Sequence, residues 1–238
     1  MKILALESSA KAASCAVVED GVPIAAAYQA TGLTHSRTLM PMVESMLQNA
    51  ELTLAGMDAI AVAAGPGSFT GLRIGIAAVK GLAWAAEKPC AAVSTLLAMA
   101  VPLQHMEGAR IVCAMDARRQ QIYNAVFSVE NGALVQTAPD RAVALSVVAE
   151  ELQGEARPTV VVGDGAALCC DFLQNAGVSC ALAPAHLRMQ SAVGVALAAE
   201  PMVLAGQTVS AQELRPTYLR LSQAERERLA RLQEQQKD

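Results

Sequence analysis

The first half of the chain alternates short apolar runs with longer stretches of helical period. Lys2 to Glu7, Ala12 to Glu19 and Val22 to Gln29 are typical of three successive strands, and Asp20-Gly21 is typical of a hairpin turn between the last two. The pattern then predicts a helix, a strand, a second helix, another strand and a third helix, over 35–50, 58–64, 69–86, 89–93 and from residue 94 or 95.

The second half repeats this order of elements. It predicts strands at 110–115 and 121–129, a turn at Asn131-Gly132, a third strand, a helix at 144–153, a strand at 159–162 and a helix at 166–176. Such repetition predicts an α/β chain of two ribonuclease-H-like lobes, with mixed sheets flanked by helices, facing each other across a cleft. The arrangement resembles actin, the sugar kinases and the Hsp70 chaperones (the ASKHA superfamily). We expect lobes at 1–106 and 107–221 and a charged tail at 222–238.

Composition agrees with a globular chain. Of 238 residues 53% are hydrophobic and 17% charged, and the net charge is -4. The apolar run that begins at Ile3 meets Glu7 too early for a leader, and no run approaches the ~18 apolar residues that suggest a membrane span, so we expect a cytoplasmic protein without membrane contact. The six cysteines contain no C-x-x-C pair, which favours buried thiols over disulfides or zinc ligands.

Metal-dependent and hydrolytic chemistry find no support in the residue order. The three histidines, His35, His105 and His186, form no H-x-x-x-H or H-E-x-x-H pair, so a helix-borne metal site is not predicted. A Ser/His/Asp or Cys/His constellation cannot be chosen from three scattered histidines.

A glycine-rich segment, Gly65 to Gly75, joins a predicted strand to a predicted helix. Its glycines are spaced neither as a P-loop nor as the G-x-G-x-x-G dinucleotide fingerprint. Glycine permits positive φ and close backbone approach, and the start of a helix suits anions. The segment therefore predicts either a bound phosphate or a closely packed backbone.

Two predicted helices carry apolar stripes at helical spacing. Methionines lie off the first stripe, and Gly71 and Gly75 thin the second helix. Either each helix packs only on its own sheet, or the pair also contacts a partner. The stripes are Leu39, Val43, Met46, Leu47 and Ala50, and Leu72, Ile76, Val79, Ala83 and Ala86.

Five segments together resemble the TsaB (YeaZ) family, the accessory subunit of the bacterial machinery that makes threonylcarbamoyladenosine in tRNA. They span most of the chain. Glu7 stands where many members have Asp. The segments are 3–9 (ILALESS), 35–41 (HSRTLMP), 65–75 (GPGSFTGLRIG), 116–118 (DAR) and 215–220 (RPTYLR).

The resemblance implies a noncatalytic scaffold that binds TsaD, with the ATPase TsaE, for threonylcarbamoyl transfer to the adenosine next to the anticodon. The catalytic paralogue TsaD binds metal through two histidines where this chain has Thr95 and Met99, so neither a catalytic residue nor a metal site is expected. Family members pair through the two helices, with TsaD or as a homodimer. The implied interface is His35, Leu39, Met42, Val43, Met46, Leu72, Arg73, Ile76, Val79, Lys80 and Ala83.

The superfamily resemblance implies nucleotide candidates in the cleft, although each has a structural alternative as a solvent-facing acid or a turn residue. No cofactor is expected for this subunit alone, and ATP or ADP with magnesium is expected only in the complex. The alternative function is a stand-alone ATP-binding phosphotransferase or ATPase. Because the chain is acidic without a basic run, we expect it to reach tRNA only through its partner. The candidates are Glu7, Ser8, Ser9, Asp116, Gly163 and Gly165.

Overall fold

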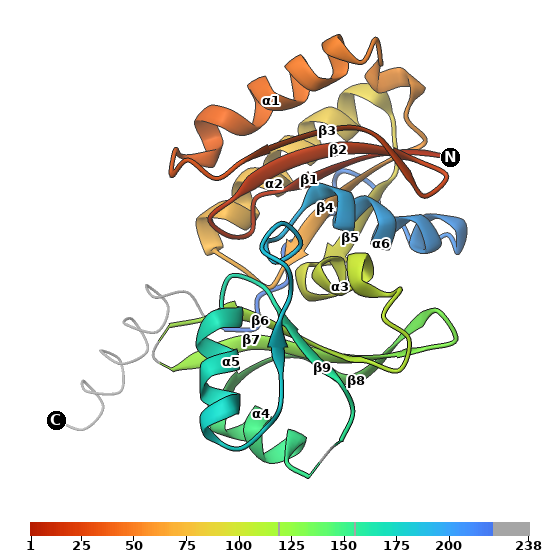
Figure 1. Cartoon of the computed structure of the whole chain (residues 1–238). Coiled ribbons are helices and arrows are strands. Elements are labelled where there is room, and N and C mark those ends of the chain that lie inside the picture. Colours follow the sequence, from red (N-terminus) through yellow and green to blue (C-terminus); the bar gives the residue numbers. More distant parts are fainter. Residues whose placement is uncertain (119, 155, 221–238) are drawn as a thin grey trace, which may run out of the picture.

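The chain is built in five layers. A computed structural model describes residues 1–118, 120–154 and 156–220. Figure 1 shows, from one end of the molecule to the other, a pair of helices, a sheet, a middle layer of helices, a second sheet and another pair of helices. The predicted class, an α/β chain of two ribonuclease-H-like lobes of ASKHA type, is confirmed.

The first sheet has the strand order β3-β2-β1-β4-β5. β1 runs antiparallel to β2 and parallel to β4, which leaves it at the centre, and its residues 3–7 are all buried. Asp20 and Gly21 have positive φ, as the predicted hairpin turn requires. The strands are β1 (Lys2–Glu7), β2 (Ala13–Glu19), β3 (Val22–Gln29), β4 (Ala59–Gly65) and β5 (Cys90–Ser94).

Two long helices cover one face of this sheet (Figure 1). They are α1 (His35–Asn49), followed by a short 3-10 turn, η1 (Leu54–Gly56), and α2 (Phe69–Ala86). The Ser68 hydroxyl accepts a hydrogen bond from the Gly71 N–H and caps the start of α2, and Glu87 in a left-handed conformation ends it.

The second sheet repeats the topology of the first, with the order β10-β9-β6-β7-β8. Asn131 and Gly132 both have positive φ, so the second predicted hairpin turn is also confirmed. Helices α4 (Leu145–Leu152) and α5 (Ala166–Asn175) cover its outer face. The strands are β6 (Arg110–Asp116), β7 (Gln121–Glu130), β8 (Ala133–Ala144), β9 (Thr159–Val162) and β10 (Ala181–Leu182).

The middle layer contains α3 (Thr95–Ala100), a 3-10 turn, η2 (Val101–Leu103), and α6 (Ala192–Leu204). The sequence pattern did not predict α6, because this helix is apolar on almost every side and shows no amphipathic period. It packs on the second face of the first sheet, although its residues lie within the range 107–221 expected for the second lobe.

The last described residues, 207–220, return along the first lobe, and we call them the C-terminal strap. Val209 exchanges two backbone hydrogen bonds with Cys90 at the edge of the first sheet. Further on, the Thr217 N–H donates to the Ala64 carbonyl. The expected charged tail, 222–238, lies outside the described residues.

None of the helices in the described ranges combines the length and the apolar character that crossing a bilayer requires.

Candidate functional site

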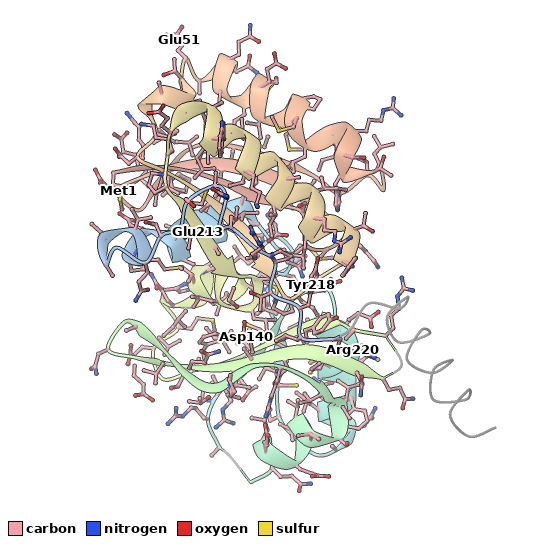
Figure 2. All side chains as sticks on the ribbon, turned by 180° about the vertical axis from the view of Figure 1, so that it is seen from behind. Met1, Glu51, Asp140, Glu213, Tyr218 and Arg220 are labelled. Carbon is pink, nitrogen blue, oxygen red and sulfur yellow. The ribbon has the colours of Figure 1, made fainter. Side chains whose placement is uncertain are left out.

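A cleft of about 560 Å³ lies between the two lobes. Its walls come from the turn after β1, the start of α2, the end of β6, the loop after β9 and the end of the C-terminal strap. Figure 2 shows Tyr218 and Arg220 where the strap passes from one lobe to the other. The charged residues that line the cleft are Lys11, Arg118 and Arg220 together with Asp116 and Asp164.

The glycine-rich loop packs backbone against backbone. A Cβ at Gly71 would lie 2.1 Å from the carbonyl oxygen of Ser8, and one at Gly67 would lie 2.6 Å from that of Ser9. The Ser68 N–H donates to the Ser9 carbonyl and the Ser8 hydroxyl donates to the Gly71 carbonyl, at 2.6 and 2.9 Å. The close backbone approach that the sequence predicted is present, and it fixes the turn in the wall of the cleft.

Glu7 is a fully buried carboxyl directly behind this turn. Its Oε1 accepts a hydrogen bond from the Ser9 N–H, whereas its Oε2 has no hydrogen-bond partner among the described residues. Burial raises the pKa of Glu7 from 4.5 to about 7, although the Ser9 hydrogen bonds oppose the shift. The negative charge of Asp164 raises this pKa further.

Glu7→Gln should make the chain more stable at pH 8 and flatten its pH dependence. The folded-state pKa lies above the ordinary value, so the folded state holds an extra proton between about pH 4.5 and pH 7. Stability is therefore fully present below that window and falls as pH rises through it, by roughly 3 kcal/mol for such a shift. Urea unfolding at pH 5 and pH 8 measures both effects; equal wild-type stability at the two pH values would contradict this ionisation.

The second lobe contributes two acids to the cleft. Asp116, at the end of β6, accepts the Arg118 N–H at 2.7 Å and stays exposed. Asp164, between the two predicted glycines, accepts a hydrogen bond from the Gln190 amide at 3.0 Å. Burial raises its pKa, and the charge of Asp116 adds to the increase. The sequence contains Gly163-Asp164-Gly165 here, but it does not show that Asp164 lines the cleft, because that depends on how the loop faces the other lobe.

The two flanking glycines have a packing role. A Cβ at Gly163 would lie 2.1 Å from the Ala114 carbonyl oxygen, and one at Gly165 would lie 2.8 Å from the Asp116 nitrogen. Neither glycine lines the cleft, and Glu7 and Ser8 lie behind its wall. Of the six nucleotide candidates, the cleft is therefore lined by Ser9 and Asp116.

An aromatic and cationic stack adjoins the cleft, whose lining includes Phe69 and Tyr218. The Phe69 and Tyr218 rings stack with centroids 4.6 Å apart, and the Arg73 guanidinium lies 3.9 Å from the Phe69 ring centroid. Arg73 also donates to the Tyr218 hydroxyl at 3.1 Å. Beyond it, Arg220 donates to the Ala117 carbonyl at 2.7 Å and so connects the C-terminal strap to the second lobe.

Most residues of the expected partner interface are buried inside this chain. Six of these buried residues belong to the core between the two helices and the first sheet. The seventh, Leu72 of α2, lies outside that cluster but is also buried. Side chains buried this way offer a partner almost no accessible surface, so the structure places these residues in the core. The seven are Leu39, Val43, Met46, Leu72, Ile76, Val79 and Ala83.

The other four interface candidates are partly exposed or exposed, and three of them have partners within the chain. His35 donates a ring N–H to the Ala10 carbonyl at 2.7 Å, Lys80 donates to the Gln212 carbonyl at 3.2 Å, and Arg73 bonds Tyr218. Met42 packs at the margin of the core.

Comparison with known proteins places the chain in a family. The family model TsaD, tRNA N6-adenosine threonylcarbamoyltransferase, matches residues 29–228. The tRNA threonylcarbamoyladenosine biosynthesis protein TsaB of Bacillus subtilis is 32% identical over 94% of this chain and 96% of its own length, and that of Escherichia coli is 33% identical over 92% and 95%. The chain belongs to the TsaB family. The solved structure of YeaZ from Pseudomonas aeruginosa agrees, with a TM-score of 0.77 and 29% identity over 92% of this chain and 99% of that one.

In this TsaB family member, Thr95 and Met99, the two residues that the family resemblance aligned with histidines of TsaD, lie in the core. Thr95 and Met99 are almost fully buried in α3, and the Met99 methyl group lies 3.3 Å from the place a Cβ on Gly163 would take. The Thr95 hydroxyl oxygen has no hydrogen-bond partner among the described residues. Within residues 1–118, 120–154 and 156–220, no group of three or more His, Cys, Asp or Glu side chains is arranged to hold a metal ion.

The outer face of α2, opposite the buried stripe, is exposed to solvent. It presents Arg73, Ala77, Gly81 and Trp84, all of them exposed, and Trp84 keeps 72% of its surface accessible. Small residues at i and i+4 let another helix come close, and an exposed tryptophan is typical of a contact surface. Sequence periodicity could have located this face, because it is the complement of the buried stripe.

Proposed function

We propose that this chain is a noncatalytic subunit of the machinery that makes tRNA threonylcarbamoyladenosine, in which it binds TsaD together with TsaE. The relatives that match it over nearly their whole length are named for this biosynthesis. The observation that supports the noncatalytic role is the burial of Thr95 and Met99 in the core at α3, the positions that the family resemblance aligns with metal-binding histidines of TsaD.

The proposed contact surface is the outer face of α2 with the adjacent exposed part of α1, which includes Met40. In the absence of TsaD the same face would pair two copies of the chain. Contact there would favour one conformation of TsaD by binding it more tightly than the others. Since this chain carries a net charge of -4, TsaD would supply the phosphate contacts that hold tRNA, and the complex would work in the cytoplasm.

Ala77→Glu should abolish or strongly weaken binding to TsaD from the same organism. Ala77 is exposed, so a glutamate costs the fold little, but it places a charge and about four more heavy atoms in a close helix contact. Isothermal titration calorimetry should show an increase in Kd of at least about tenfold, which corresponds to 1.4 kcal/mol.

Ala167→Glu is the matched control, because Ala167 is exposed on α5 in the other lobe. Its Kd should equal that of the wild type. If the wild type does not bind TsaD, the scaffold proposal fails; if both variants bind normally, the partner surface lies elsewhere on the molecule.

A second candidate function is nucleotide binding in the cleft, as in a stand-alone phosphotransferase or ATPase. The observation in its favour is the set of three cations, Lys11, Arg118 and Arg220, beside the start of α2, which together suit phosphate groups. Titrating the isolated chain with ATP, with and without magnesium, tests it. Heat of ATP binding that is present in the wild type and absent in Arg118→Ala would support this candidate. If the wild type shows no heat of binding, only the scaffold proposal remains.

A further inference from the structure

Three cysteines of the second lobe gather under its outer helices. Cys169 and Cys170 lie in the buried core of α5, and Cys180 precedes strand β10 and packs against the same core. The Cys170 and Cys180 sulfurs are 3.3 Å apart, in direct contact. The sequence favoured buried thiols over disulfides because it contains no C-x-x-C pair, and ten residues separate these two cysteines.

The two contacting thiols differ in their access to solvent. Cys170 is only 3% exposed, whereas Cys180 is partly exposed. The Gln174 amide donates to the Cys180 carbonyl at 2.9 Å, which holds the segment before β10 against α5. In this arrangement the more accessible Cys180 can attack an oxidant first, and the buried Cys170 beside it can resolve the mixed disulfide.

We propose that Cys170 and Cys180 form an intramolecular disulfide that fastens α5 to β10, the edge strand of the second sheet. All six cysteines are free thiols in the structure, so the sulfurs must move closer, to the ~2.05 Å of an S–S bond. The two sulfurs are already in contact at 3.3 Å, and the Gln174 hydrogen bond to the Cys180 carbonyl holds this segment beside α5.

A glutathione disulfide would serve as the oxidant. The Cys180 thiolate attacks one of its sulfurs, forms a mixed disulfide and releases one glutathione thiolate. The Cys170 thiolate then attacks the Cys180 sulfur and releases the second glutathione. Each protein thiol loses one proton, and the two electrons removed from the protein reduce glutathione disulfide to two glutathione thiols.

The surroundings of Cys180 make this oxidation slow and its product durable. Burial, the hydrogen bond with Cys170 and the charge of Asp171 raise the pKa of Cys180 to about 12. Few thiolates therefore exist at neutral pH, and the rate should rise about tenfold per pH unit from pH 7 to pH 9. Because reduced Cys180 gains nothing from thiolate formation, the disulfide should resist reduction once formed.

The test incubates the full chain with glutathione disulfide and counts the remaining thiols in denaturant. A second sample is unfolded, reduced and refolded in a glutathione redox buffer, which bypasses slow attack on the folded protein. We expect two of the six thiols to disappear in both samples, with a monomeric product lighter by two hydrogen atoms. The melting temperature should rise by roughly 5–10 °C, as expected for a short closed loop in a chain of this size.

Cysteine variants identify the bond. Cys170→Ala and Cys180→Ala should each keep every remaining thiol, whereas Cys169→Ala, the matched control one residue away, should still lose two. The proposal is overturned if both samples keep all six thiols, if Cys169→Ala abolishes the loss, or if the product is a disulfide between two chains.

Discussion

Ile76→Glu should unfold the first lobe rather than detach a partner. Ile76 lies in α2 with only 5% of its surface exposed, packed in the core between the two long helices and the first sheet. A glutamate there would be an unpaired buried charge, and changes of this kind cost more than about 4 kcal/mol. We expect little soluble protein, and a circular dichroism melt without a cooperative transition for any protein recovered.

Two variants separate this effect from a loss of binding. Ile76→Val should cost only about 0.5–1.5 kcal/mol, because it removes one methylene from the core. Ala77→Glu places the same charge on the neighbouring exposed position and should stay within about 0.5 kcal/mol of the wild type. A folded, stable Ile76→Glu protein that fails to bind TsaD would restore Ile76 to the interface.

Gly71→Ala and Gly81→Ala, ten residues apart in one helix, should change stability in opposite directions. The added Cβ at Gly71 meets the Ser8 carbonyl oxygen at 2.1 Å, and backbone must move to relieve it. Such overpacking costs roughly 1–3 kcal/mol or more. At Gly81 the space around the Cβ is open, so alanine should stabilise the helix by about 0.5–1 kcal/mol through its higher propensity.

Urea unfolding of the two variants and the wild type measures whether each substitution lowers or raises the free energy of unfolding. Gly71→Ala should also disturb the cleft, because the displaced Ser8 precedes Ser9 in its wall. If Gly71→Ala proves as stable as the wild type, the close packing of the glycine-rich loop on the turn after β1 is wrong.

The elements that the sequence predicted well are those with a clear period and clear ends. α2 begins and ends at the predicted residues, 69 and 86, because Ser68 caps it and the apolar stripe is regular. Both hairpin turns were predictable from Asp20-Gly21 and Asn131-Gly132. α6 was not, since a helix that is apolar all round between two sheets has no face for periodicity to detect.

The candidate site was less predictable for reasons of geometry. An apolar stripe has the same spacing whether it meets its own sheet or another protein. The spacing therefore could not show that Leu39 and Ile76, which the family resemblance assigned to the partner interface, are buried in the core. Asp164 and Arg220 enter the cleft only because β9 and the C-terminal strap end beside it. The contact between Cys170 and Cys180 depends on the return of the chain after α5.

The path of α6 and the C-terminal strap makes the second lobe an insertion. The chain leaves the first lobe after β5, builds the second sheet, and returns so that α6 covers the inner face of the first sheet (Figure 1). A fragment ending at residue 106 would therefore expose that face, including Ala16, Ala61 and Val93, to water. The first lobe begins first in the sequence, but its last residues are synthesised after those of the second sheet, so its inner face stays uncovered until α6 has been made.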